Sequence, residues 1–178
     1  MSSAADTITA YLRAKDENRP YLMRDAFEED AALAMVVKTD NIAFPATTRG
    51  RKAITDVLVR DFSNAYENVR TLCLTSAPVG TLERFSCSWL VGMSVKADGA
   101  VRVGWGHYEW TFDARTSRIR RLAITIEAMH VLPAQSLEVV ACWTFALPYP
   151  WCHAARAILT LPDLEVLQPL RDYLRSPI

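Results

Sequence analysis

Two titratable side chains of this sequence stand where a proton-transfer group could operate inside a protein. Asp61 falls on the apolar face of a helix predicted from Arg51 onward, beside Leu58 and Phe62. A carboxylate buried there would have a raised pKa and could act as a base; the alternative is a solvated helix edge or an ion pair with a neighbouring arginine. His130 lies near the end of a predicted strand with that strand's inward parity, which favours an acid or base at a cavity mouth; the alternative is a rim histidine without a partner.

Metal chemistry is not indicated. His107, Glu109 and Glu127 share one face of two predicted strands, but such a set is typical of a protein surface and not of a metal site. The cysteines lack the CxxC or histidine spacing of a zinc site. They are Cys73, Cys87, Cys142 and Cys152. We therefore predict neither a bound metal nor a cofactor.

Hydrophobic periodicity predicts the elements that position these side chains. Ile8, Tyr11 and Leu12 lie on one face of a first helix, and Pro20 interrupts it. Further helical spacing occurs at residues 21–30 and from Arg51 to about residue 66. Strands are predicted at residues 32–39, 69–76, 81–95, 100–112 and 118–132. Everything from residue 69 to 132 is thus expected to form antiparallel sheet.

Strand parity predicts which side chains point inward. Phe85, Trp89 and Met93 share one parity of their strand, and Ile124 and Ile126 share one parity of the last strand. These apolar sets should face the core. The strand between them is ambiguous, because two sets of opposite parity compete. They are Tyr108, Trp110 and Phe112 on one side, and Trp105, His107 and Glu109 on the other.

The order of elements at the start of the chain carries a resemblance to a known superfamily. A helix closes on AFEEDAALAMVV, a strand follows, and GRKAITDVLVRDFSNAY opens another helix. This order resembles nuclear transport factor 2, ketosteroid isomerase, scytalone dehydratase and the SnoaL-type polyketide cyclases, over roughly residues 6 to 132. The resemblance implies an α+β fold of the NTF2-like type, in which N-terminal helices pack on a curved antiparallel sheet to form a cone. We assign residues 1–132 to this cone domain and residues 133–178 to a helical C-terminal extension.

The resemblance also implies roles for individual residues. Tyr11 matches the ketosteroid isomerase tyrosine that donates a hydrogen bond to the enolate oxygen, and Tyr108 matches the protonated aspartic acid that shares this task. A phenol can replace that acid, because both offer one O–H to a developing oxyanion. The alternative is that both are ordinary core tyrosines. The position of the general base falls on Met35, whose thioether cannot accept a proton. The histidine pair of scytalone dehydratase and the Asp–Arg–Asp set of limonene epoxide hydrolase have no match.

Three functions are consistent with this fold. The first is an isomerase, dehydratase or cyclase that acts on a small hydrophobic molecule, with Tyr11 and Tyr108 polarising a carbonyl and Asp61 or His130 moving the proton. The second is a non-catalytic protein that binds such a ligand, which Met35 favours. The third is a structural dimer with a filled cone. The predicted pocket lining is Met35, Val37, Phe62, Tyr66, Phe85, Trp89, Trp110 and Ile124.

Composition limits the partners. Twenty basic residues offset twenty acidic ones, and no run is dominated by Lys and Arg, which argues against nucleic acid. No apolar stretch approaches eighteen residues and the N-terminus lacks a signal sequence, so we predict a cytoplasmic protein without a membrane partner. We expect a homodimer, as in relatives of this fold. The apolar extension should cap the cone mouth, cover the outer sheet face near Val101, Val103 and Trp105, or embrace a second subunit.

Overall fold

The computed structural model describes residues 2–177. It begins with helix α1 (Ala4–Asp16), which a capping box starts. The Ser3 hydroxyl accepts a hydrogen bond from the Asp6 amide at 3.1 Å, and the Asp6 carboxylate accepts one from the Ser3 amide at 2.9 Å. One face of α1 is fully buried, as the spacing of its apolar residues predicts.

The first strand begins at Phe27, five residues before the start that the sequence pattern predicts. The 3-10 turn η1 (Pro20–Leu22) and the short helix α2 (Met23–Ala26) precede strand β1 (Phe27–Val37). The predicted helix over residues 21–30 is therefore wrong in its second half. The buried residues of β1 are Phe27, Ala31, Leu33 and Met35. From Ala31 onward, burial alternates with the period of two that is typical of a strand.

Two features of the next segment were not predicted. Strand β2 (Thr47–Arg49) pairs with β1 in a stretch for which no element was predicted. The helix that follows does start at Arg51, but it has three parts. These are α3 (Arg51–Thr55), the π-helical turn η2 (Asp56–Asp61) and α4 (Phe62–Ala65).

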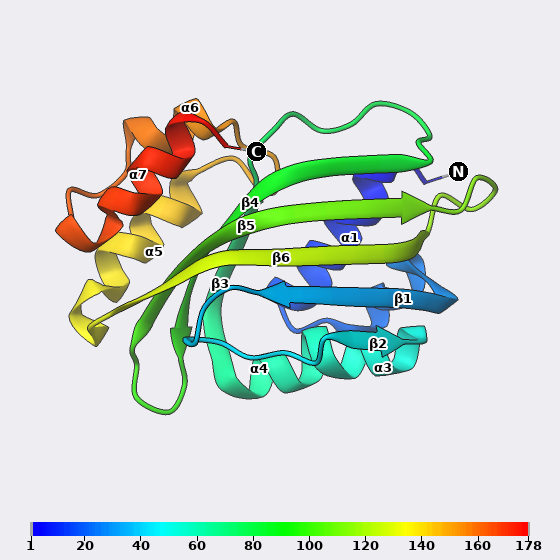
Figure 1. Ribbon diagram of the computed structural model, residues 1–178, viewed down its shortest axis with the longest axis horizontal. Helices are drawn as coiled ribbons and strands as arrows, with labels where there is room; N and C mark the ends of the chain where they lie inside the picture. The colour runs from blue at the N-terminus through cyan, green and yellow to red at the C-terminus, as the bar shows by residue number, and fades with distance from the viewer. Residues whose placement is uncertain (1, 178) are drawn as a thin grey trace.

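Six strands form one curved sheet in the order β2-β1-β6-β5-β4-β3. The remaining strands are β3 (Tyr66–Cys73), β4 (Arg84–Val95), β5 (Val101–Phe112) and β6 (Ile119–Leu132). All pairs are antiparallel except β1 with β6. The three-part helix α3–η2–α4 is called the α3–α4 rod below. Figure 1 shows α1 and this rod on the far side of the sheet, so the helices and the curved strands enclose a cone.

The inner face of the sheet and the helices bury one large apolar cluster. On β4 the inward set is Cys87, Trp89, Val91 and Met93, as parity predicts, with Phe85 partly buried beside it. The ambiguity on β5 is resolved in favour of its even-numbered side. Its inward residues are Tyr108, Trp110 and Phe112.

The C-terminal segment forms a second cluster on the outer face. Its elements are η3 (Ala134–Ser136), α5 (Leu137–Ala146), α6 (Ala154–Leu159), η4 (Glu165–Leu167) and α7 (Gln168–Arg175). They cover Val101, Val103 and Trp105, and the Tyr173 hydroxyl donates a hydrogen bond to the Gly106 carbonyl oxygen at 2.9 Å. In Figure 1 these helices lie at one end of the sheet and leave the rest of its outer face open. Among residues 2–177, no helix is both long and apolar enough to cross a bilayer.

Candidate functional site

A small cavity lies inside the cone, between α1, the α3–α4 rod and the inner sheet face. Its volume is about 50 Å³. That is room for about three or four water molecules, and it is far below the roughly 300–1,000 Å³ of a drug-sized site. Its walls are mostly apolar. They comprise Tyr11, Lys15, Met35, Ile42, Phe44, Leu58, Phe62, Thr71, Trp89, Val91, Met93, Tyr108, Ile124 and Ile126.

Two phenols meet in this cavity. Tyr11 comes from α1 and Tyr108 from β5, and their rings pack edge to face with centroids 6.3 Å apart. Burial raises the pKa of Tyr11, although the neighbouring Tyr108 hydroxyl works in the opposite direction. Burial, followed by the proximity of Tyr11, also raises the pKa of Tyr108. Both phenols are therefore neutral at physiological pH and can serve as hydrogen-bond donors.

The donors around the cavity outnumber the acceptors. The Tyr11 hydroxyl is buried and makes no hydrogen bond of standard geometry with any described residue, and the same holds for the indole N–H of Trp89. Trp89 stands against Tyr108, with ring centroids 5.6 Å apart. A buried donor without an acceptor costs about 1–3 kcal/mol. A molecule that brings an acceptor atom into the cavity would recover this energy.

A buried ion pair lies beside the phenols, with Lys15 on the cavity wall. The Lys15 ammonium lies 2.6 Å from Asp16 Oδ1 and 2.7 Å from the Thr71 hydroxyl oxygen. The Thr71 hydroxyl donates to the same Asp16 oxygen at 2.8 Å. The Lys15 and Asp16 side chains are only 8% and 3% exposed. Charged groups so deeply buried are kept only when they are paired and hydrogen-bonded, and here both conditions are met.

Asp16 also ties the cone to the C-terminal segment. Its second oxygen, Oδ2, accepts hydrogen bonds from the Thr71 amide at 2.7 Å and the Tyr149 hydroxyl at 3.1 Å. Burial and the Asp16 carboxylate raise the pKa of Tyr149, so this phenol stays a donor. The Arg70 guanidinium stacks over the Tyr149 ring, 3.9 Å from its centroid. With four donors on its two oxygens, the Asp16 carboxylate has little capacity left to accept a proton from a ligand.

The structure brings together some of the residues predicted from the sequence. Tyr11 and Tyr108 share the cavity, and Met35, Phe62, Trp89 and Ile124 line it. The other predicted lining residues lie outside this wall. Tyr66 packs on Phe62, Phe85 stacks on Trp110 farther along the cone, and Val37 packs at the cluster's edge.

The two predicted proton-transfer residues do not reach the cavity. Asp61 is exposed and lines a separate shallow hollow beside Phe44 and Tyr66. It lies at the solvated edge of the helix, the alternative stated above, while Leu58, Val59 and Phe62 are buried. His130 stacks on Trp105 on the outer face, with ring centroids 4.9 Å apart.

A β-bulge explains the placement of His130. Trp105 pairs with Ala128 and Gly106 pairs with Ile126, so Glu127 is an extra residue on β6. The bulge reverses the parity of the strand after Ile126, which turns Met129 inward and His130 outward. The predicted inward parity of His130 is therefore wrong.

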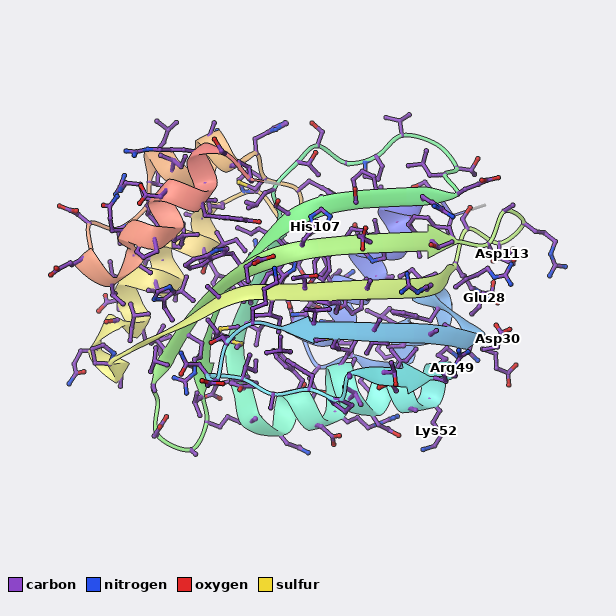
Figure 2. The ribbon with its side chains drawn as sticks, in the orientation of Figure 1. Glu28, Asp30, Arg49, Lys52, His107 and Asp113 are labelled. Carbon is purple, nitrogen blue, oxygen red and sulfur yellow. The ribbon has the colours of Figure 1, made fainter. Side chains whose placement is uncertain are left out.

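The open part of the outer sheet face carries charge. Arg49, Arg121 and Arg84 fall in one cross-strand row, separated by Ala32 and Thr111, beside a shallow hollow of about 980 Å³. None of the three arginines forms an ion pair with a residue of the described chain. In Figure 2, the labelled charged residues gather at the end of the sheet away from the C-terminal helices, whereas His107 lies on β5 near those helices. The labelled charged residues are Glu28, Asp30, Arg49, Lys52 and Asp113.

Sequence reasoning missed Lys15, Asp16 and Thr71. A signal for Lys15 was present, because it follows Tyr11 by four residues and so lies on the buried face of α1. Thr71 has the inward parity of β3 between the buried Val69 and Cys73. No sequence pattern placed Asp16, which projects from the end of α1 toward β3.

No protein-family model matches the sequence, and no curated protein matches it. Solved structures do match the fold. An LEH-like epoxide hydrolase from Mycobacterium tuberculosis has 14% identity and a TM-score of 0.51, with 69% of this chain and 81% of that chain covered. A ketosteroid isomerase-like hypothetical protein from Catenulispora acidiphila DSM 44928, in complex with trimethylamine, has 16% identity and a TM-score of 0.53, covering 67% and 83%. An NTF2-like protein of unknown function from Exiguobacterium sp. 255-15 has 17% identity and a TM-score of 0.51, covering 67% and 97%.

These similarities define the class of fold. The chain is an α+β protein with the NTF2-like cone, and the match extends over about 70% of it. Identities at this level establish the fold alone. Because proteins with this cone include epoxide hydrolases and isomerases, the fold does not select one reaction, and function has to be argued from the cavity.

Proposed function

We propose that this protein binds a small molecule with a carbonyl oxygen in the cone cavity and polarises that carbonyl with Tyr11 and Tyr108. The observation that carries the proposal is the buried Tyr11 hydroxyl, which faces the cavity without an acceptor beside a second neutral phenol. Hydrogen-bond donors held in place in a mostly apolar site stabilise a developing oxyanion without having to reorganise. Such a site suits the isomerase, dehydratase or cyclase chemistry expected from the sequence.

The cavity also sets the class of ligand. Its volume of about 50 Å³ admits a ligand of only a few non-hydrogen atoms unless wall residues such as Ile42 and Phe44 move aside. The side chains on its wall offer N–H and O–H groups, whereas the Asp16 carboxylate is already saturated. A small, mostly apolar aldehyde or ketone satisfies both conditions.

Non-catalytic binding is the second candidate, and Met35 favours it. Met35 lines the cavity where the resemblance to ketosteroid isomerase places a general base. Asp61 and His130 do not line the cavity either. On this alternative, the same donors would hold a carbonyl compound that leaves unchanged.

The test compares two ligands of the same shape. Acetone and isobutene differ in one non-hydrogen atom, an oxygen in place of a CH₂ group, and only acetone offers an acceptor. We expect the wild-type protein to bind acetone more tightly than isobutene, and Tyr11→Phe to abolish this preference. Tyr21→Phe is the matched control, because Tyr21 is 62% exposed and does not line the cavity. Tighter binding of isobutene by the wild-type protein would contradict the proposal. Exchange of the α-hydrogens of bound acetone for deuterium, faster in the wild-type protein than in Tyr11→Phe, would mark an enzyme, and binding without such exchange would mark a binding protein.

A further inference from the structure

The amine of Lys15 has an environment that no other lysine of this chain shares. Its side chain is 8% exposed and lines the cavity beside Tyr11 and Tyr108. By contrast, the side chains of Lys38 and Lys52 are 53% and 90% exposed, and Lys96 lies on the surface. A primary amine inside a small apolar cavity with two phenols is a nucleophile placed next to groups that activate a carbonyl.

We propose that Lys15 forms a covalent imine with a small aldehyde or ketone bound in this cavity, an inference that rests on the proposed function. Two contacts of Nζ are fixed, to Asp16 Oδ1 at 2.6 Å and to the Thr71 hydroxyl at 2.7 Å. The nitrogen stands 4.9 Å from the centroid of the Phe62 ring, which also lines the cavity. One position of the tetrahedral nitrogen therefore remains for the carbon atom of a ligand.

Asp16 supplies the route for the proton that must leave Nζ. A proton that passes along the 2.6 Å contact converts the ion pair into a neutral amine and a neutral acid. Thr71 holds the same carboxylate oxygen at 2.8 Å, and Tyr149 and the Thr71 amide hold the other, so the acid keeps its orientation during the transfer.

The covalent step balances without a further reagent. Rotation about the Cε–Nζ bond turns the lone pair that the departing proton leaves from Asp16 toward the ligand. This lone pair forms a C–N bond to the carbonyl carbon as the C=O π bond breaks, with Tyr11 and Tyr108 donating to the oxygen. A proton moves from nitrogen to that oxygen to give a carbinolamine. The Asp16 acid then protonates the hydroxyl group, which leaves as water while the C=N bond forms. The product is a protonated imine that pairs with the regenerated Asp16 carboxylate, so charge is conserved.

Reductive trapping tests the inference. The folded protein is treated briefly with propanal and cyanoborohydride, and each lysine is quantified by peptide mass spectrometry. We expect the propyl adduct on Lys15 to exceed that on Lys52 at least tenfold, although Lys52 is far more exposed. Lys15→Arg keeps a cation in place and should abolish the adduct. Thr71→Val and Asp16→Asn should each reduce it, and the two variants together guard against one of them failing to fold.

The two proposals fail in different ways. Adducts on Lys52 with none on Lys15, in a protein that still prefers acetone to isobutene, would overturn the imine and leave the proposed function standing. Absence of both the adduct and the acetone preference would overturn both. An adduct on Lys15 that acetone suppresses by competition would support both.

Discussion

The loss of the Asp16 charge should be among the most destabilising single changes in this protein. Asp16→Asn keeps the shape of the side chain but replaces one acceptor oxygen by an NH₂ group that faces donors. The Lys15 ammonium then stays buried without a counter-charge, and Tyr149 loses its charged acceptor. Breaking a buried ion pair from one side costs about 3–5 kcal/mol. For a chain of this length, that corresponds to a melting temperature lower by roughly 6–20 °C.

Urea unfolding with a double-mutant cycle isolates the pair. Lys15→Met alone should also destabilise, whereas Lys15→Met with Asp16→Asn should cost at least about 2 kcal/mol less than the sum of the single changes, because no unpaired charge remains buried. Asp25→Asn is the control, since Asp25 is 54% exposed and its ion pair with Arg24 is weak; we expect a change below about 0.5 kcal/mol. Additivity of Lys15→Met and Asp16→Asn within about 0.5 kcal/mol would refute the buried pair.

Four further predictions follow from the same structure. Because burial raises the folded-state pKa of Tyr108 above its ordinary value of 10.0, the free energy of unfolding should fall as pH rises above that value, and Tyr108→Phe should flatten this slope; an unchanged slope would contradict it. Met35→Asp should create a carboxylate with a raised pKa and weak proton-transfer activity on an activated ketone, and an ordinary pKa in a titration would place Met35 in solvent. Leu170→Ala should cost about 2–5 kcal/mol in urea unfolding, whereas Leu159→Ala, at an 83% exposed site, should cost little; equal costs would contradict the packing of the C-terminal helices. We expect a homodimer formed through the open sheet face, whose arginine row has no ion-pair partner in the described chain. Arg121→Glu should reduce the mass measured by light scattering to that of a monomer. A wild-type protein that is already monomeric would contradict this prediction.

The strands and their faces could be predicted from sequence because they depend on a local signal. Alternation of apolar and polar residues predicts both the existence of β4 and the inward direction of Trp89, since a pleated strand has a fixed period of two. The competing parities of β5 could not be separated in this way. They depended on the resemblance to a known fold, which selected Tyr108.

The errors have physical causes that act outside any one segment. The bulge at Glu127 arises from pairing between β5 and β6, and no residue type on β6 predicts it. The side-chain direction of His130 was therefore predicted wrongly. Helical spacing places Asp61 beside the buried Leu58 and Phe62, but it does not show whether a carboxylate at the edge of that face is buried or solvated. Lys15 is different, because its helical spacing from Tyr11 was visible; its burial depended on Asp16 and Thr71, which join it only in the folded chain.

The carbonyl ¹³C resonance of acetone labelled at C2 tests the central claim most directly. Hydrogen bonds to the oxygen draw electron density from the carbonyl carbon and move its resonance downfield. We predict that acetone bound to the wild-type protein resonates downfield of acetone in water, and that Tyr11→Phe and Tyr108→Phe each move the bound resonance back upfield. A bound resonance upfield of that in water, as in a hydrocarbon solvent, would show that the cone holds its ligand without polarising it.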